Sequence, residues 1–199
     1  MSAPPQPSSR PFVKLSAPSV AAIAPACEFS PEAAALPQAV PPEHFVAALV
    51  GANLMHDAIR FLSQALPRRE GVWWACLAAR AGALAVPPRP VDEAALAAAE
   101  TWVFKPTDEN RRAAMEHAQA AEFATPSAWA AVAAFWSAGS MAPAGQPVVP
   151  AAPELAGRAI TGAVMLAVGQ GDPAGGQQRF LQVIAAGLDI GAGGNGKTG

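Results

Sequence analysis

The stretch whose residue types and spacing best fit a known chemical site is glycine-rich and runs from Gly191 to Thr198. Its sequence, G-A-G-G-N-G-K-T, satisfies the phosphate-binding pattern G-x-x-x-x-G-K-[ST]. In that pattern backbone N–H groups and the N-terminus of a following helix converge on phosphate, and the lysine and hydroxyl reach phosphate and Mg²⁺. This sequence shows no strand before the stretch and no helix or acidic residue after it. We therefore expect a flexible glycine-rich tail. The alternative is an enzyme that uses nucleotides through this loop.

The other residues that could do chemistry lack the spacing that chemistry needs. No pair among the three histidines has a metal-ligand spacing, so we expect no metal and no other cofactor. Cys76 lies in an apolar helical run, which favours a buried free thiol over a nucleophile or a disulfide. His56, Asp57 and Arg60 fall on one helix face, which we expect to be solvated. The sequence therefore predicts no catalytic residue, and a protein that is not an enzyme.

An adjacent pair of tryptophans is the strongest candidate for a contact with another molecule. Successive residues of a helix point about 100° apart, so Trp73 and Trp74 cannot both face the same neighbour. Aromatic rings with an arginine nearby, here Arg69, are typical of the residues that anchor protein interfaces. Either both rings lie in the core, or one is exposed. The candidate partner contacts are Trp73, Trp74 and Arg69.

Helical periodicity accounts for most of the chain, in segments separated by prolines and glycines. The segment that carries the tryptophan pair, 68–83, is apolar on almost every side and is expected to be an inner helix. The preceding segment, from residue 53, is amphipathic and is expected at the surface. Its apolar stripe is Met55, Ala58, Ile59, Leu62 and Leu66, and its polar stripe is Asn53, His56, Asp57, Arg60, Ser63 and Gln64.

No segment shows convincing strand alternation, so the predicted class is all-α. We expect about seven to eight helices in antiparallel pairs, joined by short turns that contain proline. This arrangement favours a compact orthogonal helical bundle over an open solenoid. Residues 42–190 form the single predicted helical domain. Residues 1–41, rich in proline and alanine, are expected to be a disordered or loosely draped arm, and residues 191–199 a flexible tail.

Composition excludes some classes of partner. Charged residues are 14% of the chain and the net charge is −2, which does not provide the basic surface that nucleic-acid binding requires. The apolar run at 159–168 is about half the length of a membrane span, and no signal segment is recognisable. Together with the free thiol, these features predict a cytoplasmic protein that binds no nucleic acid and does not span a membrane.

Four stretches together resemble an uncharacterised family of bacterial alanine- and tryptophan-rich helical proteins, a domain of unknown function. They are R-E-x-x-W-W-A-C-L-A-A-R from Arg69, P-T-x-E-x-R-x-A-A from Pro106, T-P-x-A-W-A-A-x-A-x-F-W-S from Thr125 and A-G-R-A-I-x-G-A-V from Ala156. The likeness covers about Phe45 to Leu188. Such proteins are encoded beside type VI secretion components, and the family carries no catalytic residues to transfer. The resemblance thus implies a non-catalytic accessory or adaptor protein that binds a protein partner. A purely structural helical oligomer is a further alternative, and the sequence leaves the oligomeric state open.

Overall fold

The computed structural model describes residues 10–143 and 145–197, and within these ranges the secondary structure is helical. In these ranges β-type pairing is limited to one isolated bridge between Ser140 and Pro150. The predicted all-α class is confirmed. The helices are α1 (Val20–Ile23), the 3-10 helix η1 (Ala24–Ala26), α2 (Pro31–Ala34), α3 (Pro42–Gly51), α4 (Met55–Ala65), α5 (Arg68–Ala83), α6 (Pro90–Phe104), α7 (Asp108–Ala120), α8 (Pro126–Trp136), α9 (Leu155–Val168), the 3-10 helix η2 (Pro173–Gly175) and α10 (Gly176–Gly191).

Several helices begin where threonine or proline makes a helix start favourable. The Thr107 and Thr125 hydroxyls accept hydrogen bonds from the backbone N–H groups of Asn110 and Ala128, at 3.2 and 3.3 Å. These bonds satisfy donors that the first turns of α7 and α8 would otherwise leave unpaired. Proline occupies the first position of α8, where its missing N–H costs nothing. Both signals are local, because they involve residues within four positions of the helix start.

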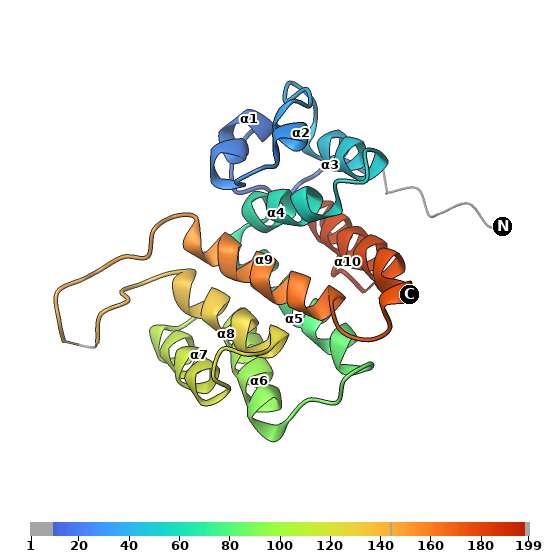
Figure 1. Cartoon of the computed structure of the whole chain (residues 1–199). Helices are drawn as coiled ribbons and strands as arrows, with labels where there is room; N and C mark the ends of the chain where they lie inside the picture. Colours follow the sequence, from blue (N-terminus) through green and yellow to red (C-terminus); the bar gives the residue numbers. More distant parts are fainter. Residues whose placement is uncertain (1–9, 144, 198–199) are drawn as a thin grey trace.

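The centre of the bundle is formed by α5, which packs against α6, α8 and α9 (Figure 1). Five of the eleven residues of the neighbouring helix α8 are alanines, and residues 130–134 are buried. Small side chains let α8 approach α6, α7 and α9 closely, and large rings such as those of Trp74 and Trp102 fill the remaining space. The predicted compact bundle with an inner α5 is confirmed.

Residues 10–41 are folded onto the domain, which corrects the expectation of disorder for this part of the arm. Residues 1–9 of the predicted arm lie outside the described residues. The segment 10–41 contains α1, η1 and α2 and lies beside α4, on the side away from α6–α8 (Figure 1). Val20, Ile23 and Cys27 belong to the same buried cluster as the domain core. The segment is therefore draped over the domain, which was the alternative to disorder in the prediction. It forms short helices where its prolines allow them.

The predicted solvated face of α4 is correct only in part, because half of the polar stripe is buried while Asn53 and His56 are exposed and Arg60 is partly exposed. Asp57, Ser63 and Gln64 are buried. The N-terminal segment covers them: the Ser30 backbone N–H and hydroxyl both donate to the Asp57 carboxylate, at 2.9 Å each. On another side the Gln64 amide donates to the Glu154 carbonyl at 3.1 Å, next to α9. Asp57 and Gln64 are thus polar residues that make hydrogen bonds to other segments of the chain.

The C-terminal stretch also differs from its prediction, since residues 192–197 are folded against the domain. The Asn195 carbonyl accepts a hydrogen bond from the Trp73 indole N–H at 2.8 Å. Gly191, the last residue of α10, lies against the Phe12 ring, and its carbonyl accepts from the backbone N–H of Val13 at 2.8 Å. The expected flexible tail is thus a short fixed segment up to residue 197, and Thr198 lies outside the described residues.

Candidate partner-binding site

The structure shows which of the two adjacent tryptophans is buried, a question that the sequence left open. Trp74 lies in the core with no exposed surface, and its indole N–H donates to the Val183 carbonyl at 2.8 Å. The ring passes over Gly187, where an added Cβ would lie 3.1 Å from it. This burial removes Trp74 as a contact with a protein partner.

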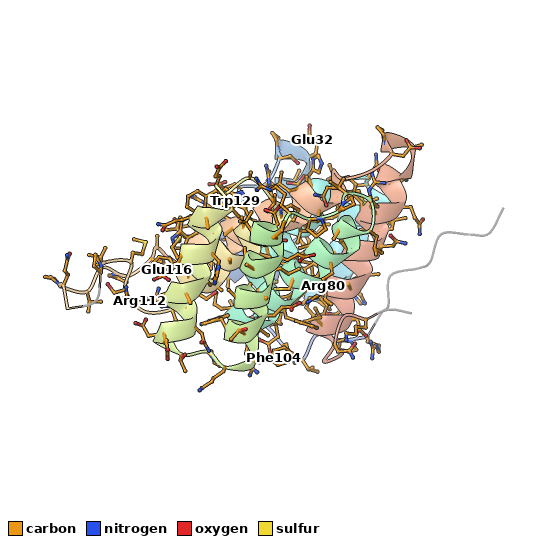
Figure 2. All side chains as sticks on the ribbon, turned by 90° about the horizontal axis from the view of Figure 1, so that it is seen from below. Glu32, Arg80, Phe104, Arg112, Glu116 and Trp129 are labelled. Atoms are coloured by element: carbon orange, nitrogen blue, oxygen red, sulfur yellow. The ribbon has the colours of Figure 1, made fainter. Side chains whose placement is uncertain are left out.

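Trp73 is only half-buried, and its ring packs against an aromatic side chain from the next helix. The centroids of the Trp73 and Phe104 rings are 6.2 Å apart, with the ring planes at 61°. Phe104, the last residue of α6, is 72% exposed. It lies at the lower edge of the molecule in Figure 2. An exposed phenyl ring braced by an indole is a rigid apolar surface of the kind that protein interfaces use.

Arg69, the third predicted contact, is exposed and fixed beside these rings. Its Nε–H donates to the carbonyl of Val103 at 2.5 Å, in the last turn of α6. A cation at a helix C-terminus is favourable because it meets carbonyls that have no partner within the helix. The bond orients the guanidinium next to Phe104. The Lys14 ammonium also lies at this surface, 3.5 Å from the Glu70 carboxylate.

Together these residues line a shallow groove of about 320 Å³ at the junction of α5, α6 and the C-terminal segment. We call it the aromatic groove. It is lined by Lys14, Arg69, Glu70, Trp73, Val103, Phe104, Ile190, Gly194 and Asn195. Its apolar floor and its rim of two cations and one carboxylate can hold a segment of another protein.

Sequence reasoning missed Phe104. The inward stripe of α6 ends with Trp102 and Val103, both buried, and Phe104 follows on the solvent side. A large aromatic residue off the apolar stripe, directly before a helix end, is the signal that could have found it. That signal is weak, since single exposed apolar residues are common on protein surfaces.

The three histidines considered as metal ligands do not come together, whereas Arg60 and Asp57 form an ion pair at 3.7 Å. His44, His56 and His117 are exposed and lie on three different helices, α3, α4 and α7. The His56 ring packs against Phe180, with 5.2 Å between ring centroids. Within the described residues no group of three His, Cys, Asp or Glu side chains could hold a metal ion.

Both cysteines are free and buried, as expected for Cys76. Burial, and to a smaller extent the nearby Asp57 carboxylate, raise the pKa of the Cys27 thiol to about 12. Burial likewise raises the pKa of Cys76. A thiol acts as a nucleophile through its thiolate, which these environments disfavour at neutral pH.

The glycine-rich stretch surrounds a carboxylate. The Asp189 side chain accepts a hydrogen bond from the Gly196 backbone N–H at 3.0 Å and forms an ion pair with Arg10. Its backbone carbonyl accepts from the Gly194 N–H at 2.8 Å. Asp189 thus occupies the place near Gly196 that an anion would take in a phosphate-binding loop, and Lys197 is exposed.

Across residues 10–143 and 145–197, no helix is both long enough and apolar enough to cross a membrane. Comparison with curated proteins finds no match, and neither does comparison with solved structures. The four sequence stretches that suggested an uncharacterised family all lie within residues 69–164. A family model described as a family of unknown function (DUF6931) matches residues 45–191, and the chain belongs to this family.

Proposed function

We propose that the protein is a non-catalytic accessory or adaptor protein, which binds a protein partner through the aromatic groove. The setting we propose is the cytoplasm of a bacterium, within a type VI secretion cluster. The observation that carries the proposal is the exposed Phe104 ring, braced by Trp73 and flanked by Arg69. The secretion setting is supported by the family resemblance of the four sequence stretches alone.

The groove has the composition of an interface anchor. Tryptophan and arginine are enriched among the residues that dominate the binding energy of protein interfaces. The two side chains are already fixed, Trp73 by its bond to the Asn195 carbonyl and Arg69 by its bond to the Val103 carbonyl. Because they are held before binding, these two side chains lose less conformational freedom when a complex forms.

The test is affinity capture from the native cytoplasm with the wild type and two matched variants. Phe104→Ala removes the exposed ring at the end of α6, whereas Val91→Ser removes an exposed apolar side chain, 37% accessible, near the start of the same helix. We expect the wild type and Val91→Ser to capture the same secretion component. A ring that anchors an interface contributes about 2 kcal/mol, so Phe104→Ala should weaken binding of the purified component about thirtyfold.

Two results would overturn the proposal. Recovery of no secretion component by the wild type removes the proposed setting. Equal capture by Phe104→Ala and Val91→Ser removes the aromatic groove as the contact surface. Circular dichroism and thermal unfolding of both variants separate a loss of contact from a loss of fold.

The two alternative functions have separate tests. A nucleotide-using enzyme requires saturable ATP or GTP binding that Lys197→Ala abolishes, and such binding would displace the adaptor proposal. The Asp189 carboxylate at the Gly196 N–H favours the adaptor, because it would repel phosphate there. A purely structural oligomer requires a mass in solution that is a fixed multiple of 20.2 kDa in the absence of any partner.

A further inference from the structure

A second concave surface lies on the other side of the C-terminal segment from the aromatic groove. It is a cavity of about 420 Å³ between α5 and α10, closed at one end by the last turn of α9 and along one side by Gly196 and Lys197. Gly194 and Asn195 belong to the groove, whereas Gly196 and Lys197 belong to the cavity, so the two surfaces share no residue. Its volume falls within the range of small-molecule sites, about 300–1,000 Å³.

The wall of this cavity is apolar. Trp74, Leu77 and Ala78 of α5 face Val183 and Ala186 of α10, and Val168 closes the end. The Trp74 indole cannot offer its N–H to a ligand, because the Val183 carbonyl already accepts it at 2.8 Å. The walls therefore suit a hydrocarbon body.

The charged residues that line the cavity are both cations. They are Arg179 and Lys197, and no aspartate or glutamate is among the lining residues. The Arg179 Nε–H donates to the Val168 carbonyl at 2.8 Å, which fixes the guanidinium beside the cavity. Within residues 10–143 and 145–197 neither cation forms an ion pair with a carboxylate. Their positive charge is thus available to a ligand.

We infer that this cavity is a binding site for a small organic anion with an aliphatic body, of the medium-chain acyl carboxylate class. The chain lies along the apolar wall between α5 and α10, and the carboxylate meets Arg179 and Lys197. A volume of 420 Å³ equals about 14 molecules of liquid water at about 30 Å³ each. A ligand of about the same number of non-hydrogen atoms fills it, and dodecanoate is such a molecule.

Titration calorimetry with dodecanoate tests the inference directly. We expect saturable 1:1 binding with a Kd of about 0.1 mM, which is ordinary for a ligand of this size. Dodecyltrimethylammonium has the same chain with the opposite charge, and acetate has the charge without the chain. We expect both to bind at least about tenfold more weakly. The first lacks the negative charge that meets the two cations, and the second lacks the chain that contacts the apolar wall.

Three variants locate the binding. Ala81→Phe adds a ring at an exposed position that lines the cavity and should weaken dodecanoate more than about tenfold. Lys197→Gln should weaken it about fivefold, the usual contribution of one exposed cation. Lys105→Gln removes an exposed cation that is not in the cavity and should leave the Kd unchanged.

Three outcomes refute the inference. They are no saturable binding of dodecanoate up to about 1 mM, equal binding of dodecanoate and dodecyltrimethylammonium, and a Kd that Ala81→Phe leaves unchanged. Thermal unfolding of each variant confirms that it is folded. The proposed adaptor function does not enter these measurements, because no partner protein is present, so the two proposals can fail separately.

Discussion

The contact between Ser30 and Asp57 should fix the N-terminal segment to the domain, and removing the carboxylate should release that segment. Asp57 is 4% exposed and accepts two hydrogen bonds from Ser30, one from the backbone N–H and one from the hydroxyl, both at 2.9 Å. The perturbation is Asp57→Ala. It leaves both Ser30 donors without their acceptor, in a place that is partly shielded from water.

The size of the effect follows from these two bonds. A hydrogen bond to a charged group contributes about 1.5–3 kcal/mol, and because Ser30 is half-buried the lower figure applies to each. Asp57→Ala should therefore lower the free energy of unfolding by about 3 kcal/mol. That is a large part of the 5–15 kcal/mol typical of a whole domain. In a double-mutant cycle with Ser30→Ala, the coupling should be about 1.5 kcal/mol, because this change removes one of the two bonds to Asp57. The hydroxyl also accepts a hydrogen bond from the Ala33 N–H at 3.2 Å, and the cycle cancels the loss of that bond.

Urea denaturation gives the free energy, and amide hydrogen exchange shows where it is lost. We expect exchange in residues 19–34 to accelerate more than exchange in α8, since the segment can open without unfolding the core. Glu116→Ala, which removes an exposed carboxylate from α7, is the control and should change the stability by less than about 0.5 kcal/mol. A loss below about 1 kcal/mol in Asp57→Ala with unchanged exchange in residues 19–34 would refute the reasoning.

Three further predictions concern other parts of the fold. Gly187→Ala should lower the free energy of unfolding by about 1–3 kcal/mol, since its Cβ would lie 3.0 Å from a Leu62 methyl; Gly51→Ala, with open space around it, should raise it by up to about 1 kcal/mol. A hydrogen bond from Arg89 lowers the pKa of Asp92, so this carboxylate stabilises the fold above its unfolded pKa near 4. That contribution is lost as pH falls through the lower folded pKa. In urea denaturation below pH 4, the free energy of unfolding of Asp92→Asn should therefore depend less steeply on pH than that of the wild type. Both thiols should resist iodoacetamide at pH 8 in the folded protein and react on unfolding, and fast labelling of the folded chain would contradict the assigned burial.

Local signals in the sequence predict the helices well. The starts of α7 and α8 follow from Thr107 and Thr125, because a hydroxyl before a helical run, joined in α8 by a proline at the first position, acts within four residues. The inner place of α5 follows from its apolar residues on nearly every side. Such features need no knowledge of the rest of the chain.

The burial of the α4 polar stripe could not be predicted in the same way. Asp57 and Gln64 look like residues of a solvated face until their partners are known. Those partners are Ser30, 27 residues away, and the Glu154 carbonyl, 90 residues away. The proline-rich composition of the arm describes its lack of long helices, but its serines and few apolar residues decide that it docks. Composition alone does not contain that information.

The candidate site could be predicted only in part, because it too depends on contacts between segments far apart in the chain. The pair Trp73-Trp74 could be read as one inward and one outward ring, but which is which depends on where α10 passes. Gly187 of α10 lets the Trp74 ring approach, and Asn195 fixes the Trp73 ring near the surface. Phe104 and the cavity beside Lys197 likewise arise where segments far apart in the chain meet.

The glycine-rich stretch shows how a sequence motif can arise from packing. At Gly196 the backbone has φ +75°, and an added Cβ would lie 2.7–2.8 Å from the Leu77 and Ile190 side chains. At Gly194 an added Cβ would lie within 2.5 Å of the Asp189 carboxylate. Glycine is needed at both positions for the segment to fold back over the end of α10, where it forms one wall of the aromatic groove and one wall of the cavity. The spacing that resembles a phosphate-binding loop therefore has a structural cause that involves no phosphate. That cause also puts this short segment between the two surfaces at which we propose that the protein binds other molecules.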